Sequence, residues 1–414
     1  MGKTHHRVSI IIPAWNNWEL SCKCLQSLHE HTHGISFEVV LVDNGSTDKT
    51  PHDGPLLGQA LFGDSFTYAQ LPDNMGFAKA CNHGASESRG KLLLFLNNDT
   101  TVTSGWLPPL VEALKGQPRL GGVGPLLVFP DETFRAQSVQ HLGIAVHYGP
   151  NFQHLYEMFP ASHPVVQRQR KLSAITAAAF LIPATLYAAH GGFHEGYVNG
   201  MEDMDLCSRI AGQGGYFTVV PESVVQHHTN CTPGRFDMET ENQCLLEQRC
   251  RSVEETCCRL HAEDGFESAF TPWLTLVPKL PEERVRALDA EYGGVRDLDQ
   301  LHALIQQEPL WDTGYISIIR ESLTADNPVF ATMMSHLRTL LCPSFIAFRN
   351  HLEFMRLFGN DALAQEFGNK VARIDAALAD KTALVQKARA IEMKTRDPLT
   401  VAALEVWRKQ NAPE

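Results

Sequence analysis

Short apolar runs alternate with segments of helical periodicity along the first half of the chain. Val8–Ile12 and Phe37–Val42 are continuous runs of branched and aromatic residues, which is typical of strands buried on both faces. Between them, Trp18–His31 carries apolar residues at helical spacing and is followed by Gly34. This β, α, β order predicts two parallel strands joined by a helix.

The same alternation continues downstream. We predict further strands over Phe66–Leu71, Leu92–Leu96, Gly121–Phe129, Ala174–Ile182 and Tyr216–Val225. Helices are predicted over Phe77–Ser88, Trp106–Lys115 and Glu202–Ile210, with a helix or loop over Lys49–Asp64. Between Pro130 and Lys171 the periodicity fades, so we expect irregular hairpins and a mobile loop.

Beyond about Asp237 the pattern changes to helices alone. These are predicted over Thr240–His261, Pro281–Tyr292, Leu298–Gln307, Thr313–Leu323, Val329–Leu341, Ser344–Leu357, Ala362–Leu378 and Thr400–Gln410. No repeat of fixed period is evident in the sequence, and a divergent stack of helical repeats stays an alternative. We therefore predict an α/β domain over residues 1–238 and an all-α domain over 239–414.

Composition narrows the class of protein. With 35 Lys and Arg against 47 Asp and Glu, the formal charge is −12, which argues against a general nucleic-acid binder. No apolar run is long enough for a transmembrane helix and Met1–Arg7 does not open a signal peptide, so we expect a cytoplasmic protein. The ten cysteines form no paired CxxC set, which favours reduced structural thiols over a zinc site.

Polar side chains follow four of the predicted elements where a parallel sheet would present its ligand crevice. Pro13–Asn16 follows the first strand, Asp43–Asp48 the second, and Asn97, Asn98 and Asp99 follow Leu92–Leu96. An acidic cluster, Glu202–Asp205, and then His227 come later. Because ligands bind beyond the carboxyl ends of such strands, a carboxylate there is well placed to hold a cation against a phosphate.

These segments together resemble family 2 glycosyltransferases, the inverting enzymes of the GT-A fold, which is a Rossmann-like nucleotide-binding mixed sheet. The resemblance rests on VSIIIPAWN at 8–16, VDNGSTD at 42–48, NMGFAKACNHG at 74–84, LNNDT at 96–100, GGFHEGY at 191–197 and MEDMDLCSR at 201–209. It covers about the first 235 residues and implies nothing about the helical remainder.

The resemblance implies a nucleotide-sugar donor held at the first strand ends. Pro13, Ala14, Trp15, Asn16 and Asp43 match positions that grip the base and ribose of a UDP- or dTDP-sugar, with the Asp43 carboxylate accepting from the imide N–H. Asp43 could equally cap a turn. Lys79 and Asn82 match positions near the base and phosphates, and a solvated helix residue is the alternative for Lys79.

Asn97, Asn98 and Asp99 occupy the place of the DXD motif. The resemblance implies that Asp99 coordinates Mn²⁺ or Mg²⁺ on the donor diphosphate. Asn97 replaces the first Asp of the usual motif, so one carboxylate is missing, and this NND form looks like that of rhamnosyltransferase-type members. A simple cap at the strand end is the structural alternative.

Asp203 matches the catalytic base of the family, and Glu202 and Asp205 compete for that role. His227 matches a histidine that completes the metal site or contacts the diphosphate, with His228 as the alternative. Three further residues, Trp106, His141 and His154, are candidates for the acceptor side.

The expected reaction is metal-assisted transfer of a sugar to a hydroxyl of a glycan, lipid-linked or protein acceptor. A lipid-linked acceptor would be met peripherally at a membrane. The helical domain serves either as a homo-oligomerisation surface or as an acceptor-docking platform. The rival hypothesis is a nucleotide-binding pseudoenzyme whose helical half docks a partner, and its support is the missing DXD carboxylate at Asn97. A sugar-nucleotide pyrophosphorylase would need a Gly-rich basic loop after the first strand, which Pro13–Glu19 lacks.

Overall fold

A computed structural model describes residues 7–133, 135–148, 151–228, 238–250, 254–358 and 361–411. The chain divides into two compact units. The first, here called the sheet unit, comprises Met1–Val146, Phe152–Glu157 and Val166–Glu254. The second, the helical unit, comprises His147–Asn151, Met158–Val165 and Glu255–Glu414. The division of the two units therefore falls after Glu254, and two short earlier segments join the second unit.

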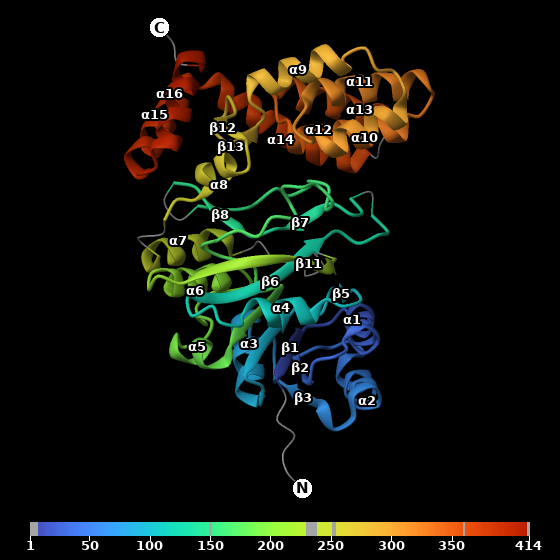
Figure 1. The fold of residues 1–414 in the computed structure, drawn as a ribbon, viewed down its shortest axis with the longest axis vertical. Helices are drawn as coiled ribbons and strands as arrows, with labels where there is room; N and C mark the ends of the chain where they lie inside the picture. Colours follow the sequence, from blue (N-terminus) through green and yellow to red (C-terminus); the bar gives the residue numbers. More distant parts are fainter. Residues whose placement is uncertain are drawn as a thin grey trace. The chain divides into compact units, whose positions relative to one another are not determined.

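The sheet unit is built on a mixed sheet (Figure 1). Its strands run in the order β3-β2-β1-β4-β10-β6-β11-β5, and β7 pairs with β6. Strands β1 to β4 pair in parallel, whereas β10 is antiparallel to both β4 and β6. This confirms the predicted GT-A type of sheet. The bounds are β1 Val8–Ala14, β2 Phe37–Asp43, β3 Phe66–Gln70, β4 Leu92–Leu96, β5 Thr100–Val102, β6 Leu120–Val128, β7 Val139–His141, β10 Ala179–Pro183 and β11 Tyr216–His227.

Helices cover this sheet and bury its apolar runs. On α1, Cys24, Leu25 and Leu28 are fully buried against the strands, as their helical spacing predicts. Trp106 is also fully buried and its indole N–H donates to Thr32 Oγ1 (3.1 Å), so this residue belongs to the core and does not line an acceptor site. The helices are α1 Trp18–His31, α2 Thr50–Phe62, α3 Phe77–Glu87, α4 Leu107–Ala113, α5 Ala184–Ala189, α6 Glu202–Ala211 and α7 Glu239–Arg249.

Strand β1 extends two residues further than a proline would suggest. Pro13 and Ala14 still pair with Val42 and Asp43 of β2, whereas the pairing of β1 with β4 ends at Ile11. At Pro13 the strand therefore has one neighbour, and a missing N–H is tolerated where a strand is an edge.

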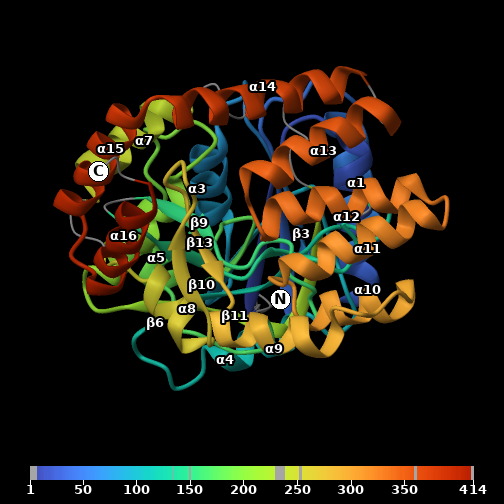
Figure 2. The ribbon, with the colours of Figure 1, turned by 90° about the horizontal axis from the view of Figure 1, so that it is seen from above.

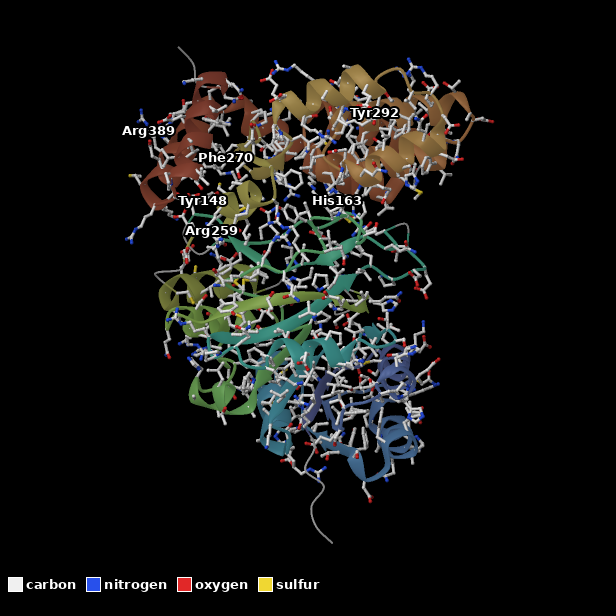
Figure 3. The ribbon with its side chains drawn as sticks, in the orientation of Figure 1. Tyr148, His163, Arg259, Phe270, Tyr292 and Arg389 are labelled. Atoms are coloured by element: carbon white, nitrogen blue, oxygen red, sulfur yellow. The ribbon has the colours of Figure 1, made fainter. Side chains whose placement is uncertain are left out.

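The stretch between β6 and β10 contains the expected hairpins. Strand β7 joins the main sheet, and β8 (Ile144–Val146) pairs with β9 (Phe152–His154). His163, labelled in Figure 3, illustrates why residues 158–165 belong to the helical unit. Its Nδ1 accepts from Val165 N (3.2 Å), so Nε2 carries the proton and donates to Gln307 O (3.1 Å).

The prediction that the helical unit consists of helices alone is wrong. A hairpin of β12 (Glu267–Phe270) and β13 (Leu276–Lys279) follows α8 (Cys257–Glu263), and strands of four residues are too short to give a clear period. Helix α15 was also not predicted, and the single helix predicted over 240–261 is divided into α7 and α8. The remaining helices, seen in Figure 2, are α9 Glu282–Tyr292, α10 Leu298–Gln307, α11 Asp312–Thr324, α12 Pro328–Leu341, α13 Phe345–Phe358, α14 Asp361–Ala379, α15 Lys381–Lys394 and α16 Pro398–Asn411.

Within the described part of the chain, none of the helices combines the length and the apolar character that crossing a membrane requires.

A buried carboxylate fastens the amino-terminal ends of β1 and β2. Glu38 is fully buried and accepts from Ser9 Oγ (2.6 Å), from Arg89 N (2.6 Å) and from Arg89 Nε (2.7 Å). Burial alone would raise the pKa of Glu38, but the hydrogen bonds from Ser9 and Arg89 and the charge of Arg89 lower it. The ionised form is therefore favoured by folding.

We predict that Glu38→Gln lowers the free energy of unfolding by about 1–3 kcal/mol at neutral pH, because the bonds to an ionised acceptor are lost. A carboxyl whose pKa is lower in the folded state contributes stability above the unfolded value of 4.5, and that contribution is lost as the pH falls through the folded value. Denaturant titrations between pH 7 and pH 3 should therefore show a smaller loss of stability in the variant. Parallel losses in both proteins would contradict the assignment.

Candidate active site

The loops after β1 and β2 are locked together by Asn16. Its side-chain oxygen accepts from Thr47 N (2.8 Å) and Asp48 N (3.3 Å), and its own backbone N–H donates to Ser46 Oγ (2.8 Å). Asn16 has a φ of 55°, in the left-handed region that asparagine tolerates better than most residues. These bonds place the first two predicted donor segments side by side.

Asp43 is fully buried at the end of β2. It accepts from Ser46 N (2.9 Å) and from the Tyr68 hydroxyl (2.7 Å), which uses two of the roughly four lone-pair positions of a carboxylate. Burial and the neighbouring Asp43 raise the pKa of Tyr68, so this hydroxyl stays a donor. The bond to Ser46 is the turn-capping contact considered above, and the contact of Asp43 with a nucleotide base stays a prediction.

A third loop joins the first two through Asn44. Its amide nitrogen donates to Asn74 Oδ1 (2.9 Å) and its oxygen accepts from Met75 N (2.8 Å). Gly45 permits this approach, because it has a φ of 74° and a Cβ there would lie 2.4 Å from the Asp73 carbonyl carbon. The turn that begins α3 is thereby held against the end of β2.

Asn82, predicted near the phosphates, holds a turn of the protein itself. Its amide donates to Phe193 O (2.9 Å) and Glu195 Oε1 (3.0 Å), and its oxygen accepts from the Tyr187 hydroxyl (2.6 Å) and Phe193 N (3.1 Å). All four hydrogen-bonding positions of the amide are used, so a nucleotide contact would require one of these bonds to break. Lys79 lies half-buried one turn earlier on α3.

Asn97, Asn98 and Asp99 are tied to three other elements. Asn97 N donates to Ala178 O (2.9 Å), Asn98 Nδ2 donates to Ser21 Oγ (2.8 Å), and Asp99 O accepts from His228 N (2.9 Å). The turn after β4 is therefore fixed to the segment that leads into β10, to α1, and to the end of β11.

His227 is the ring that meets Asp99. Its Nε2 lies 3.1 Å from Asp99 Oδ1 and 3.3 Å from Asn97 Nδ2. On the other side of the ring, Nδ1 lies 2.7 Å from Gln140 Oε1, while Gln140 Nε2 donates to the His227 carbonyl oxygen (2.8 Å). The side chains of His227 and Asp99 are 5% and 13% exposed.

Gln140 decides which nitrogen of His227 carries the proton. Because its amide nitrogen donates to the backbone, its oxygen faces the ring and must accept, so the proton lies on Nδ1. With the proton on Nδ1, the Nε2 atom is an acceptor that faces both the Asn97 amide nitrogen (3.3 Å) and the Asp99 carboxylate oxygen (3.1 Å). A cation bound between Nε2 and Asp99 Oδ1 would bring these two acceptors together as ligands. A nitrogen and a carboxylate oxygen suit Mn²⁺ better than Mg²⁺, which prefers oxygen ligands alone.

The protein supplies few ligands for such a cation. Among the described residues, no group of three or more His, Cys, Asp or Glu side chains could hold a metal ion. Asp99 and His227 form a pair, so the remaining ligands of a bound cation would come from the diphosphate and water. This is the arrangement expected of a metal that binds together with the donor.

The three carboxylates at the start of α6 lie in different environments. Asp205 is fully buried and ion-paired with Arg209 (2.8 Å) and Arg249 (2.5 Å). Burial would raise the pKa of Asp205, but the bonds and charges of the two arginines lower it. Glu202 is also buried and accepts from Gly200 N (2.8 Å). Both side chains are therefore engaged in holding the protein together.

Asp203 is the half-buried member of the cluster. Its Oδ2 accepts from Ala177 N (2.9 Å) and its Oδ1 accepts from Met204 N (2.8 Å). The next residue, Ala178, is the one whose carbonyl binds Asn97 N. Two consecutive residues before β10 thus bind the predicted base and the predicted metal-binding turn, so both groups are tied to the same short segment.

His141 and His154, the two acceptor-side candidates, contact each other. The Nδ1 atoms lie 3.1 Å apart, and His141 Nε2 accepts from Thr176 N (3.2 Å). Burial, with the neighbouring charges of His154 and His227, holds the pKa of His141 well below its usual value. His141 is therefore a neutral core residue that donates from Nδ1, whereas His154 is exposed.

Sequence reasoning missed Gln140 because it lies in the stretch where periodicity fades, in a pattern with no motif to single it out.

Comparison with known proteins relates part of the sheet unit to a known family. Residues 9–180 match the model of the family described as Glycosyl transferase family 2. They belong to that family. The match includes the loops around Asn16, Asp43 and Asp99, whereas Asp203 and His227 lie beyond it.

Three relatives illustrate the similarity of this chain to known proteins. An uncharacterized protein, y4gI of Sinorhizobium fredii, is 29% identical over 277 residues, which is 65% of this chain and 29% of that protein. The O-antigen biosynthesis protein RfbC of Myxococcus xanthus is 31% identical over 55% of this chain and 18% of that protein. The N-acetylglucosaminyl-diphospho-decaprenol L-rhamnosyltransferase of Mycobacterium tuberculosis is 27% identical over 48% of this chain and 68% of that enzyme. The chain thus spans less than a third of the length of the first two relatives.

We predict that Gln140→Leu weakens Mn²⁺-dependent binding of a nucleoside diphosphate by about 10–100-fold, the usual effect of removing a group that orients a metal ligand. Isothermal titration with UDP and dTDP, with and without Mn²⁺, measures this. Gln248→Leu, an exposed change on α7, serves as the matched control. An unchanged Mn²⁺ effect in Gln140→Leu would show that the tautomer of His227 is irrelevant to the metal.

Proposed function

We propose that this chain transfers a sugar from a UDP- or dTDP-sugar to an acceptor hydroxyl with inversion, assisted by a divalent cation. The observation that carries the proposal is the pair of bonds at Ala177 and Ala178, which holds Asp203 beside the turn of Asn97 to Asp99. This supports a proposed base and a proposed metal-binding turn at the crevice where an α/β sheet binds its ligands.

On the donor side, Asp99 Oδ1 and His227 Nε2 would hold the cation against the diphosphate. When bound, the metal supplies positive charge that stabilises the leaving diphosphate. The protein would contribute one carboxylate and one imidazole nitrogen, and a cation on His227 Nε2 would replace the contact of that atom with Asn97 Nδ2 (3.3 Å), because the nitrogen has a single lone pair. The chain's own task here would be to keep both ligands in place. Two hydrogen bonds between Gln140 and His227, here called the Gln140 clamp, hold the ring, and the bond from His228 N to the Asp99 carbonyl oxygen holds the turn.

On the acceptor side, Asp203 acts as the general base. Its carboxylate takes the proton of the acceptor hydroxyl while that oxygen forms a bond to the anomeric carbon and the bond from that carbon to the diphosphate oxygen breaks. Attack from the face opposite the leaving group inverts the configuration. The N–H groups of Ala177 and Met204 orient the carboxylate and leave lone pairs on both oxygens.

The names of the relatives support a class of sugar and a class of acceptor. The proteins similar to this chain include one of O-antigen biosynthesis and an L-rhamnosyltransferase that acts on a diphospho-decaprenol-linked sugar. These names support a hexose, deoxyhexose or amino sugar as the donor group and a glycan or lipid-linked glycan as the acceptor class.

A donor-hydrolysis screen tests the proposal. UDP-, dTDP- and GDP-sugars are incubated with the full chain and Mn²⁺ or Mg²⁺, and released nucleotide is measured. We expect release from UDP- or dTDP-sugars in Mn²⁺, and Asp99→Ala should abolish most of the metal effect because a single neutral ring cannot hold the cation. Nucleotide binding without any release or transfer would instead support the pseudoenzyme.

Asp203→Asn should lower transfer by roughly 10²–10⁴-fold while donor affinity stays within about twofold, because the amide keeps the shape but cannot take a proton. Single-turnover transfer and donor titration separate the two effects. Asp205→Asn is the contrasting variant, since it breaks the buried bonds to Arg209 and Arg249 and should lower the melting temperature. Near-normal turnover in Asp203→Asn would reject the assignment of the base.

A further inference from the structure

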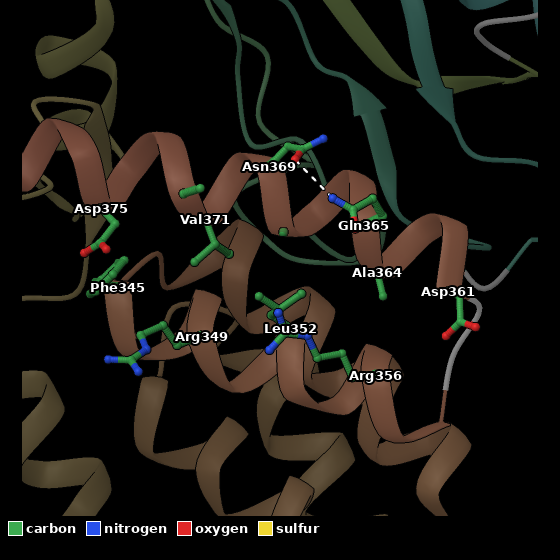
Figure 4. A pocket seen from close by; sticks show the side chains of 12 residues that line it. Phe345, Arg349, Leu352, Arg356, Asp361, Ala364, Gln365, Asn369, Val371 and Asp375 are labelled. Atoms are coloured by element: carbon green, nitrogen blue, oxygen red, sulfur yellow. Dashed lines mark hydrogen bonds between the residues drawn. The ribbon is translucent and has the colours of Figure 1, made fainter.

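Charges of both signs line the groove between α13 and α14 of the helical unit (Figure 4). Arg349 and Arg356 come from α13, and Asp361 and Asp375 come from α14. Arg356 is in addition paired with Glu353 on its own helix (2.8 Å). This mixture favours no single class of ligand. The sheet unit contains a more specific arrangement, where α7 meets the start of α6.

A side chain of α7 holds the loop before α6 by its backbone. Asn242 is buried, its Oδ1 accepts from Val198 N (3.1 Å), and its Nδ2 donates to Val198 O (2.9 Å). One amide thus satisfies both backbone groups of a residue that lies 44 positions earlier in the chain. We call these two bonds the Asn242 brace. The side chain of Val198 is exposed, so the loop is held here through its backbone.

The braced loop has an unfavourable backbone conformation on both sides of Gly200. Asn199 has a φ of 51° and Met201 a φ of 73°, in the left-handed region that residues other than glycine seldom adopt. Such conformations persist only where the surrounding contacts impose them. Within the loop, the Gly200 N–H donates to Glu202 Oε2 (2.8 Å). From outside the loop, the support comes from the Asn242 brace.

This loop determines how α6 begins. Met201 directly precedes the first residue of α6, and Asp203 is the second residue of that helix. A displacement of Met201 therefore also moves Asp203, whose Oδ2 accepts from Ala177 N (2.9 Å) on another segment. An N–H···O bond spans a narrow range of about 2.7–3.2 Å, so this contact tolerates little movement.

Helix α7 is attached to the rest of the sheet unit by further contacts. Arg249 Nε donates to Asp205 Oδ1 (2.5 Å). Leu246 is fully buried and belongs to the same small apolar cluster as Tyr197. Because these contacts remain when Asn242 is replaced, loss of the Asn242 brace should release the loop without detaching the helix.

We propose that Asn242 is a positioning residue for glycosyl transfer, which holds Val198 and thereby keeps the Asp203 carboxylate where it meets the acceptor hydroxyl. This role rests on the function proposed above, in which Asp203 is the general base. Asn242 lies beyond residues 9–180, the part of the chain that matches the family model. Because it acts through the loop and touches neither donor nor acceptor, its loss should lower turnover and leave donor binding intact.

The variant Asn242→Asp keeps the shape of the side chain and makes its hydrogen bonding depend on pH. A protonated carboxyl accepts from Val198 N and donates to Val198 O, as the amide does, whereas an ionised one only accepts. Burial raises the pKa of a carboxyl, which brings its titration toward neutral pH. Nucleotide release from the active UDP- or dTDP-sugar, relative to wild type at each pH, should therefore rise by about tenfold between pH 8 and pH 5. The affinity for UDP and dTDP with Mn²⁺ should stay within about twofold of wild type.

Two further variants complete this experiment, at a temperature where circular dichroism shows every protein folded. Asn242→Ala should lower turnover by about 10–100-fold at every pH, the usual effect of a small misplacement of a catalytic group. Glu241→Gln changes a carboxylate to an amide at the neighbouring, exposed position of α7 and should match wild type. Normal turnover in Asn242→Ala, or a ratio of Asn242→Asp to wild type that is constant with pH, would overturn the proposal.

Hydrogen exchange tests the positioning without any turnover. Because the Ala177 N–H donates to Asp203, displacement of Asp203 should make this amide exchange at least about tenfold faster in Asn242→Ala. The amide of Ile10, in the core strand β1, should keep its wild-type rate, which excludes general destabilisation. Unchanged exchange at Ala177 would overturn the proposal. If the wild type releases no nucleotide from any sugar donor, the proposed function fails, and the exchange at Ala177 still decides whether Asn242 positions Asp203.

Discussion

The position of β10 is the constraint on which the active-site region depends. This strand runs antiparallel between β4 and β6, so the residues just before it lie beside the carboxyl end of β4. Ala178 can then accept from Asn97, and Ala177 can donate to Asp203 on α6. Asn97 and Ala178, which are far apart in the chain, meet because one strand reverses direction, and backbone groups of Ala177 and Ala178 make both connections.

Around this frame, similar side chains acquire different roles through their partners. Asp203, Asp205 and Glu202 are neighbours in sequence, but Asp205 forms ion pairs with two arginines and Glu202 accepts from the backbone of Gly200, and both carboxylates are buried. Burying a carboxylate is tolerated where cations or N–H groups compensate it, and such a group has little basicity left to offer. Asp203, half-buried and held by two backbone N–H groups, keeps an accessible carboxylate. Likewise Gln140, an ordinary glutamine by sequence, determines how His227 presents its nitrogen.

The two units differ in how much their sequences disclose. In the sheet unit, loop residues are specific, because Gly45 and Asn16 adopt left-handed backbone conformations and Asn44 bonds a neighbouring loop. In the helical unit, the helices pack through buried positions such as Leu301, Ile318 and His351, where different residue types serve the same purpose. A packed helix interface requires a side chain of suitable size at a given place, and several residue types meet that requirement.

The sequence by itself determined the order of strands and helices in the sheet unit, because continuous apolar runs and helical spacing are local properties of Val8–Ile12 or Trp18–His31. It also determined which residues are candidates for the site, through the polar groups at strand ends and their resemblance to one family. It did not disclose the hairpin β12–β13, the clamp of Gln140 on His227, or the use of all four bonds of Asn82 within the protein. These depend on which distant groups are brought within about 3 Å of each other, the range of a hydrogen bond. Only the tertiary structure decides that, since pairing across a sheet joins residues whose separation in the chain leaves no local trace.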